Sequence, residues 1–332
     1  MIISASRRTD IPAFYTEWFL DKLKAGWMIV VNPFNANQAN LVPLNKNDVE
    51  CYVFWSKNPK PLLDRMDELI DLIGPDSFYF QFTLNGYGPT VEPKLPSLNE
   101  RIATFKALSE RIGAERVIWR YDPVLLTERF TKEWHMESFD YLAEKLHPFT
   151  KKCVFSFVDP YKKTVRNTEN LNIGNPNEYP MEEIAESFSK TARKYNLELS
   201  TCCEAIDLEK YGITHNRCID DVLIEKITEK KVCSERDNQR EHCGCIKCKD
   251  IGANDTCLHH CLYCYANRNP EIADNLKIDP TSPLLGSLGD RTIFNGKDGN
   301  LKLYYEKKII IDLDNWVESR KKPSKQTQQT LL

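Results

Sequence analysis

The stretch CLHHCLYCYAN, at residues 257–267, concentrates thiols in a short segment. It places Cys257, Cys261 and Cys264 in the order C-x3-C-x2-C. Thiolates at this spacing can meet one metal centre from a single loop, and iron–sulfur clusters normally take four cysteine ligands. A loop of three would therefore hold three corners of a [4Fe–4S] cluster and leave the fourth iron without a protein ligand.

The other thiols are unevenly distributed. The sequence contains 12 cysteines, and only Cys51 and Cys153 lie in the first 200 residues. Because several of the rest surround the three-cysteine loop, we predict a second centre nearby, either an auxiliary [4Fe–4S] cluster or a zinc ion. The preferred ligands are Cys203, Cys218, Cys243 and Cys245, with Cys248 as a substitute. Buried free thiols are the alternative for any one of these residues.

Zinc offers a competing interpretation of the loop itself. Structural zinc sites commonly use C-x2-C pairs, and the sequence contains Cys245-x2-Cys248 and Cys261-x2-Cys264. The histidines at 259–260 can also ligate a metal, although we expect them to shape the loop or to hydrogen-bond a sulfide. The third loop cysteine and the flanking tyrosines favour the iron–sulfur interpretation.

Length and composition limit the class of protein. The chain has 332 residues, 41% of them hydrophobic, and a net charge of -3 with a pI of about 6.1. This charge balance does not suit a protein held to nucleic acid by electrostatics alone. We find neither an apolar run long enough to span a membrane nor the basic-then-apolar order of a secretory signal. We therefore expect a cytoplasmic protein that has no membrane partner and keeps its thiols reduced.

Short apolar segments alternate with amphipathic helical ones over the first 200 residues, a pattern typical of βα units and a parallel sheet. An added hairpin is expected at 27–44, and Ser97 with Glu100 forms a capping-box pattern. The predicted strands are 1–6, 50–55, 77–84, 116–121, 152–158 and 197–203. The predicted helices are 17–25, 61–73, 98–112, 131–145, 181–195 and 220–228.

Polar residues follow each of the six predicted strands. In a parallel barrel the loops after the strands share one face, and that face carries the site. Exposed loops are polar in any protein, but charged or amide residues after all six strands favour a functional mouth. The strands run into Arg7-Arg8-Thr9-Asp10, Ser56-Lys57-Asn58, Asn85-Gly86, Asp122-Pro123, Asp159-Pro160 and Glu204. The arginines after the first strand can bind a phosphate or carboxylate, or lock the barrel through Asp10.

The cysteine loop resembles a known motif. C-x3-C-x-aromatic-C, with Tyr263 as the aromatic residue, is similar to the signature of the radical S-adenosylmethionine (radical SAM) superfamily. Tyrosines on both sides of the last cysteine, Tyr263 and Tyr265, resemble spore photoproduct lyase and its relatives. SRRTDIP at the start and DIGANDTC before the loop resemble a bacterial family of unassigned function related to these enzymes.

The resemblance implies a fold and a chemistry. The fold would be an α/β (βα)6 partial barrel of the TIM type. S-adenosylmethionine (SAM) would chelate the open iron of the [4Fe–4S] cluster held by Cys257, Cys261 and Cys264. Its reductive cleavage would give a 5′-deoxyadenosyl radical, with electrons from a donor such as flavodoxin or ferredoxin. The substrate is unassigned, with a DNA lesion or a peptide as candidates, so nucleic acid is a candidate partner.

The resemblance also suggests site residues. FWSKN at 54–58 resembles a strand end whose Ser56 and Lys57 meet the SAM carboxylate, and QFTLN at 81–85 resembles the next strand, with Thr83 and Asn85. A positive lysine beside a carboxylate is physically reasonable. Tyr263 and Tyr265 would lie near the radical and pass hydrogen atoms. The remaining cofactor-binding candidates are Arg120, which could instead pair with Asp122, and Glu204.

The sequence departs from the superfamily pattern in two respects. The motif usually follows the first strand, whereas here it comes late and must fold back over the barrel mouth. No Gly-Gly-Glu motif follows the second strand. We therefore expect a barrel at 1–204, a cysteine-rich iron–sulfur segment at 205–280 and an extension at 281–332. The extension would end in a disordered tail, QTQQTLL, that faintly resembles sliding-clamp peptides.

Two other classes of protein fit the same residues. One is a non-enzymatic binding module stabilised by zinc or iron–sulfur cysteines. The other is an iron–sulfur redox protein that does not use SAM.

Overall fold

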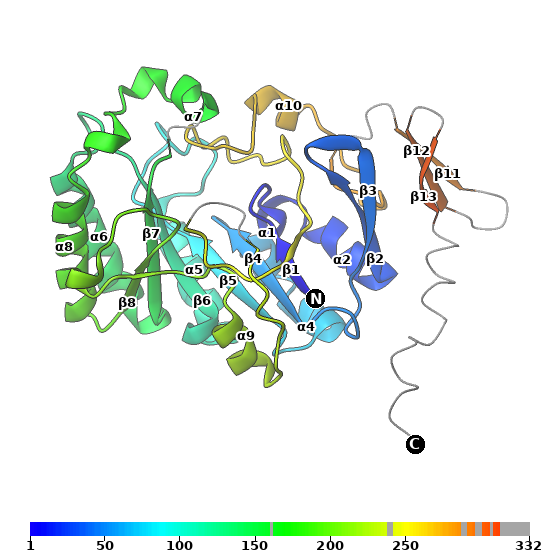
Figure 1. Ribbon diagram of the computed structural model, residues 1–332, viewed down its shortest axis with the longest axis horizontal. Coiled ribbons are helices and arrows are strands. Elements are labelled where there is room, and N and C mark those ends of the chain that lie inside the picture. The colour runs from blue at the N-terminus through cyan, green and yellow to red at the C-terminus, as the bar shows by residue number, and fades with distance from the viewer. Residues whose placement is uncertain (160–161, 238–241, 287–290, 296–300, 306–307, 313–332) are drawn as a thin grey trace.

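A large parallel sheet organises the molecule. The computed structural model describes residues 1–159, 162–237, 242–286, 291–295, 301–305 and 308–312. Eight strands form the sheet in the order β10-β1-β4-β5-β6-β7-β8-β9, and every neighbouring pair is parallel. The fold is therefore a mixed α/β fold, in which the middle six strands follow chain order (Figure 1).

The six predicted strands are all present. They are β1 (Ile2–Ala5), β4 (Cys51–Ser56), β5 (Phe78–Thr83), β6 (Val117–Val124), β7 (Lys152–Phe157) and β8 (Glu198–Thr201). Two short strands not predicted from the sequence extend the sheet at its edges, β9 (Thr214–His215) beside β8 and β10 (Lys249–Asp250) beside β1. The sheet therefore continues beyond residue 204, because part of the cysteine-rich segment pairs with the first strand of the chain.

Helices connect the strands. They are α1 (Ile11–Phe14), α2 (Thr16–Ala25), α3 (Lys60–Leu63), α4 (Met66–Ile73), α5 (Leu98–Ile112), α6 (Lys132–Leu146), α7 (Lys162–Asn167), α8 (Met181–Lys194), α9 (Asp221–Thr228) and α10 (Pro270–Asp274). The capping box at Ser97 and Glu100 is confirmed. The single helix predicted at 61–73 is wrong. The chain leaves helical geometry at Arg65, whose guanidinium pairs with Glu17 and Glu68, and α4 starts afresh at Met66.

The two faces of the sheet carry different side chains, because successive residues of a strand point to opposite faces. On one face Phe54, Phe80, Trp119 and Phe155 are fully buried and belong to the main core, which includes the apolar sides of the connecting helices. The alternate positions form a second core with side chains that come from later in the chain. Its strand members are Ile2, Cys51, Val53, Tyr79, Ile118 and Val154, and its later members include Cys218, Ile219, Ile224, Ile227, Cys245 and Ile246.

This second face, the inner face, is therefore covered by residues 218–227 and 245–246 rather than by the connecting helices. Burial of each large aliphatic side chain contributes about 1.5–3 kcal/mol, so the second core fixes these residues against the sheet. Along the sheet, α9 lies at the end opposite α7 and α10 (Figure 1). The apolar residues of the inner face lie toward the α9 end of the strands. The polar residues that are candidates for the site follow the strands at their other end.

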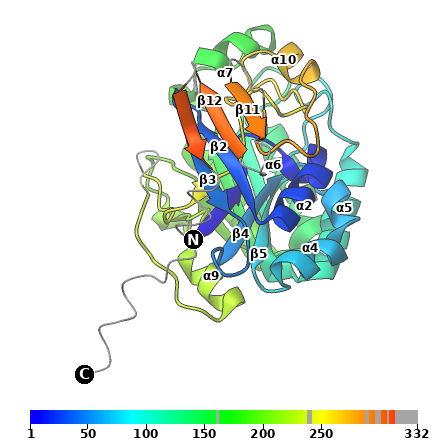
Figure 2. The ribbon, with the colours of Figure 1, turned by 90° about the vertical axis from the view of Figure 1, so that its right-hand side faces the viewer.

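A smaller β structure lies beside the first strands. The predicted hairpin is confirmed as β2 (Trp27–Asn32) and β3 (Asn35–Pro43), which pair antiparallel. Strands β11 (Arg291–Asn295), β12 (Leu301–Tyr305) and β13 (Lys308–Asp312) form a separate antiparallel sheet next to this hairpin (Figure 2). The predicted disordered tail lies outside the described residues, as does the resemblance of QTQQTLL to a clamp peptide. Within the described residues, no helix has the length and apolar character needed to cross a membrane.

Candidate metal centres

The three-cysteine loop docks against the ends of the first strands of the sheet. Leu262 donates its backbone N–H to Val91 in the loop after β5, at 3.0 Å. On the other side, the hydroxyl of Thr9 donates to the carbonyl of Ala253 at 2.7 Å. Asn267 closes the loop on itself, since its side-chain amide donates to the carbonyl of Cys257 at 2.6 Å. The late segment therefore lies where β1 and β5 end.

The thiols of Cys257, Cys261 and Cys264 lie near enough to influence one another electrostatically. Burial, followed by the charge of Cys264, raises the pKa of Cys257 to about 12. Burial also raises the pKa of Cys261 well above its usual value, and the positive charge of Lys57 opposes this. Without a metal these two thiols hold their protons, so metal binding would release protons as the thiolates form.

Asp10 joins this loop to two strand ends. Its carboxylate accepts hydrogen bonds from the hydroxyl of Ser56 at 2.7 Å and from the backbone N–H of Lys57 at 2.7 Å. The same carboxylate lies 2.7 Å from Nε2 of His259, inside the cysteine loop, and caps α1 through Ala13. Asp10 therefore holds β1, β4 and the loop in fixed relative positions. The hydroxyl of Ser56 is one of the groups that bind Asp10.

A buried ionic network lies next to the loop. Nζ of Lys57 lies 2.9 Å from Oε1 of Glu92 and 2.7 Å from the hydroxyl of Tyr263. The Tyr263 hydroxyl also donates to Glu92, and Arg101 donates to the other Glu92 oxygen at 3.3 Å. Burial lowers the pKa of Lys57, but the charges of Glu92 and Cys261 outweigh it, so the pKa lies above its usual value.

Sequence reasoning missed Glu92 and Arg101. Glu92 is a charged residue in the loop YGPTVEP, where its neighbours are mostly apolar or small. That contrast is the only local signal, and it does not identify a partner. Burial raises the pKa of Glu92. The charges of Lys57 and Arg101 lower it by more, so this pKa lies below its usual value.

The residues after β5 lie near this network. Thr83 ends β5 half-buried, and its hydroxyl has no hydrogen-bond partner within the described part of the chain. Asn85 is buried, and its amide donates to the Asp122 carbonyl at 2.9 Å while its side-chain oxygen accepts from Asp122 N–H at 2.8 Å. Asn85 Nδ2 also lies 3.4 Å from the Tyr263 hydroxyl. Asn85 therefore links the ends of β5 and β6, whereas the Thr83 hydroxyl is available to bind a ligand.

The two tyrosines of the motif have different environments. Tyr263 is held in the buried network described above. Tyr265 is 47% exposed, and its hydroxyl donates to the carbonyl of Arg7 at 2.8 Å. The structure therefore does not bring the two hydroxyls together, although both were predicted to lie near a radical.

A second group of thiols comes from the segments that follow β8 and β9 and from the segment that precedes β10. Cys202 Sγ is 3.5 Å from Cys218 Sγ. Cys203 interacts with both Cys202 and Cys243, and Cys245 interacts with both Cys218 and Cys243. Four of these five residues are the preferred ligands predicted from the sequence, and Cys202 is an addition. We call the five residues the thiol ring.

Two arginines face the thiol ring from the sheet. Arg120 on β6 lies 3.0 Å from Cys218 Sγ through Nη1 and pairs with Asp122 through its other nitrogens. Arg7 lies 3.7 Å from Cys248 Sγ, so Cys248 stands beside the ring. Both guanidinium groups pack on the Trp55 ring, at 5.1 Å for Arg7 and 5.2 Å for Arg120. Arg120 therefore contacts the second thiol group and Asp122, and no contact joins it to the three-cysteine loop within the described residues.

Asp250 and Glu204 complete this end of the sheet. Asp250, on β10, accepts hydrogen bonds from Ser4, Ser6 and the guanidinium of Arg8, and it was not singled out in the sequence. Glu204 accepts the backbone N–H of Phe157 at 2.8 Å. Burial, with the charges of nearby acidic groups, raises the pKa of Glu204 to about 7. A carboxyl that titrates near neutrality is a frequent property of functional sites.

A family model described as "Domain of unknown function (DUF1848)" matches residues 2–266. The chain belongs to the DUF1848 family. The matched region begins with β1 and ends with the three-cysteine loop, so it contains the eight-stranded sheet and both groups of thiols. Among curated proteins, none matches the chain.

The described residues of the DUF1848 region do not bring together the four cysteines of the competing zinc site. That site needs Cys245 and Cys248 beside Cys261 and Cys264, but the first pair lies at the thiol ring and the second at Lys57 and Cys257. Among the described residues, no three His, Cys, Asp or Glu side chains are arranged to hold a single metal ion. Around one tetrahedral zinc, the sulfur atoms would be about 3.8 Å apart.

The three-cysteine loop does fit a larger group. Nδ1 of His259 and Oδ1 of Asn267 are buried and have no hydrogen-bond partner among the described residues. Buried polar atoms usually find partners, in the protein or in a bound group. Three thiols, a lysine and these two atoms would suit a cluster with a polar ligand, so the residues present fit the [4Fe–4S] cluster and SAM that the motif suggests.

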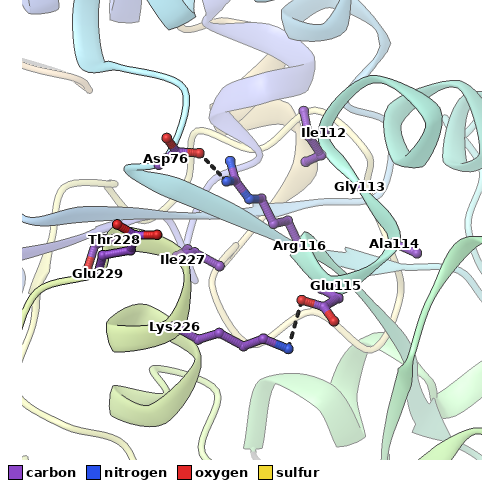
Figure 3. Close-up of a pocket in the computed structure, with 10 residues that line it drawn as sticks. All are labelled: Asp76, Ile112, Gly113, Ala114, Glu115, Arg116, Lys226, Ile227, Thr228 and Glu229. Atoms are coloured by element: carbon purple, nitrogen blue, oxygen red, sulfur yellow. Dashed lines mark hydrogen bonds and ion pairs between the residues drawn. The ribbon is translucent and has the colours of Figure 1, made fainter.

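A cavity of about 500 Å³ lies at the opposite end of the sheet (Figure 3). Its lining includes Arg116, Glu115 and Lys226. The charged groups pair with one another, since Lys226 Nζ lies 2.8 Å from Glu115 and Arg116 pairs with Asp76. Asp76 precedes β5, Glu115 and Arg116 precede β6, and Lys226 lies on α9. This end of the strands is the side that supports stability in parallel α/β folds. We therefore place the candidate site at the two groups of thiols.

Proposed function

We propose that this protein is a radical SAM enzyme built on a (βα)6 partial barrel of the TIM type. The observation that carries the proposal is the position of the C-x3-C-x2-C loop, which lies against the strand ends where Lys57 and Thr83 are found. Six consecutive parallel strands with helices on one face support the barrel. The inner face has a core of its own, which supports curvature of the sheet around residues 218–227 and 245–246.

Cys257, Cys261 and Cys264 would hold the [4Fe–4S] cluster. When bound, the cluster and SAM together would supply one-electron reductive cleavage of SAM and so generate the radical that acts on substrate. The protein's own residues position and shield this chemistry. Asp10 fixes the loop through His259, and the buried contacts of Cys261 limit the access of water.

Lys57 and Thr83 are the residues best placed to meet SAM. They follow paired positions on neighbouring strands, since Ser56 pairs with Phe82 in the β4–β5 register. An ammonium group has three N–H donors, and two of those on Lys57 go to Glu92 and Tyr263. The third donor and the Thr83 hydroxyl would bind a carboxylate. A role for Arg120 or Glu204 at SAM has less support, because their contacts are with the second group of thiols.

The test is an anaerobic preparation of the full chain reconstituted with iron and sulfide. With dithionite and SAM, the wild-type protein should produce 5′-deoxyadenosine, quantified by chromatography. Cys261→Ala should abolish this product, whereas Cys233→Ala, at an exposed position away from both groups, should not. Lys57→Ala should raise the SAM concentration needed for half-maximal product.

The competing function is a non-enzymatic zinc or iron–sulfur module. It predicts either a colourless protein that contains zinc or a brown protein that makes no 5′-deoxyadenosine. Either result would overturn the enzymatic proposal. The substrate class, the electron donor, nucleic-acid binding and the cytoplasmic location stay predictions.

A further inference from the structure

The thiol ring joins three loops that are distant in sequence. Cys202 and Cys203 follow β8, Cys218 follows β9, and Cys243 and Cys245 precede β10. The thiol contacts run from each residue to the next and close on themselves: Cys202 to Cys218, then to Cys245, Cys243, Cys203 and back. Free cysteines buried for packing have no reason to converge in this way from three loops.

Hydrogen-bond donors face two of the ring thiols. Cys218 Sγ is 3.0 Å from Arg120 Nη1 and 3.2 Å from Asn216 Nδ2, which both donate N–H groups to it. Cys245 Sγ accepts the backbone N–H of Ile219 at 3.4 Å. Hydrogen bonds of this kind orient metal-ligating thiolates and tune the metal they hold. Nearby positive charge also lowers the cost of forming a thiolate.

The guanidinium groups supply a matching charge. Arg120 is only 4% exposed, and Arg7 interacts electrostatically with Cys218, Cys245 and Cys248. A four-thiolate metal centre carries net negative charge, and burying that charge is costly unless it is paired. The two arginines, both packed on the Trp55 ring, provide this pairing from the loop after β1 and from β6.

The shape of the ring discriminates between a single ion and a cluster. One tetrahedral zinc would need every pair of its sulfurs about 3.8 Å apart. Within the described residues no three ligands meet in this manner, and the thiol contacts join only neighbours around the ring. A four-iron cluster takes four cysteine ligands, and the ring supplies five thiols. To reach the irons, the thiols would turn away from contacts such as the 3.5 Å one between Cys202 and Cys218.

We propose that four of the five ring thiolates hold a second [4Fe–4S] cluster, separate from that of the three-cysteine loop. The buried members, Cys218 and Cys245, are its fixed ligands. The half-exposed side is open, because Cys243 lines a cavity of about 340 Å³ together with Arg217, Arg236 and His215. A small electron carrier or a ligand can approach the cluster from this side.

This proposal does not depend on SAM chemistry, and its test is metal analysis of the full chain. Anaerobically reconstituted wild-type protein should contain about eight iron atoms, since each cluster holds four. Cys218→Ala and Cys261→Ala should each retain about half of that iron, and the double variant almost none. Cys233→Ala is the control and should retain all of it.

Spectroscopy of the Cys261→Ala protein isolates the second cluster. After reduction with dithionite it should show an electron paramagnetic resonance signal that SAM does not perturb and that Cys243→Ala changes. If Cys218→Ala does not fold, as judged by circular dichroism, Cys203→Ala and Cys243→Ala at the half-exposed side replace it. The proposal is overturned if these ring variants keep the wild-type iron content. It is also overturned if they lose one zinc ion rather than iron, or if the ring contains a Cys202–Cys218 disulfide instead of a metal.

Discussion

Nζ of Lys57 lies 2.7 Å from the hydroxyl oxygen of Tyr263, a residue 206 positions further along the chain. Glu92 contacts both groups, and its side chain is fully buried. The three-cysteine loop is therefore held to the sheet by charge as well as by packing. A buried carboxylate shared by a lysine, an arginine and a tyrosine makes the loop sensitive to single substitutions.

Glu92→Gln should strongly destabilise the protein. The substitution keeps the shape of the side chain but leaves Lys57 and Arg101 buried without their counter-charge, which costs about 3–5 kcal/mol. Urea unfolding followed by circular dichroism measures the free energy of unfolding. Glu182→Gln removes a surface ion pair with Lys210 and should leave that free energy almost unchanged. Equal effects of the two variants would contradict the network.

Tyr263→Phe and Tyr265→Phe separate the two tyrosines of the motif. Tyr263→Phe removes hydrogen bonds to charged partners and should cost about 1.5–3 kcal/mol. Tyr265→Phe removes one hydrogen bond from a half-exposed side chain and should cost about 1 kcal/mol or less. We expect reconstituted Tyr263→Phe protein to lose iron faster to a chelator than Tyr265→Phe protein. The reverse order would mean that the contacts of Tyr263 do not hold the loop.

Gly252→Ala tests the close approach between β10 and the end of β1. A Cβ at Gly252 would collide with the Ser6 hydroxyl and lie 2.6 Å from Ser6 Cβ. Overpacking of this kind costs about 1–3 kcal/mol. Gly88→Ala is the matched control, since nothing lies within 4 Å of a Cβ there. Thermal unfolding should show a lower midpoint for Gly252→Ala alone, and a shift of similar size in both would argue against the close contact.

His135 should make stability fall in weakly acidic solution. Burial lowers its pKa to about 4, and its ring lies 2.8 Å from the Tyr121 hydroxyl and 2.9 Å from the Leu125 carbonyl. In the unfolded chain His135 therefore binds a proton near pH 6.5, whereas in the folded chain it binds this proton only near pH 4. The contribution of His135 to stability is lost as the pH falls through this window, by roughly 3 kcal/mol. Glu204, whose pKa is raised to about 7, contributes in the opposite direction.

The measurement is urea unfolding at a series of pH values between 7 and 4. His135→Gln should change the wild-type slope by roughly 3 kcal/mol between pH 7 and 4, because the new side chain does not titrate. His215→Gln, at an exposed position on β9, should keep it. A wild-type slope in the His135→Gln protein would assign the pH dependence to other groups.

The strands were predictable because their signal is local. Apolar runs such as those at β4 and β5 are fully buried on both faces, as expected for a parallel sheet, and turn residues bound them. The boundaries of α5 agree with its capping box. The break at Arg65 was not predictable, since neither Gly nor Pro marks it and the partner of Arg65 on α2, Glu17, lies far along the chain.

The site was predictable only in part. Spacing alone indicated the three-cysteine loop, and clustering in the sequence indicated most of the thiol ring. Glu92, Arg101 and Asp250 could not be found in this way, because each acts through partners far along the chain. Their importance follows from burial and charge pairing, which exist only once the sheet has formed.

The edge position of β10 has a consequence for the order of events during synthesis. Ser4 and Asp250, which hydrogen-bond where β1 meets β10, are 246 residues apart. At about 5–20 residues per second, a ribosome needs roughly ten to fifty seconds to make the intervening chain. During that time one edge of β1 has no strand beside it and can pair with another chain. Assembly of the proposed metal centres would also wait, because their last ligands leave the ribosome after the central strands of the sheet. Expression at low temperature or with insufficient iron would prolong this interval, and we expect aggregation to increase with it.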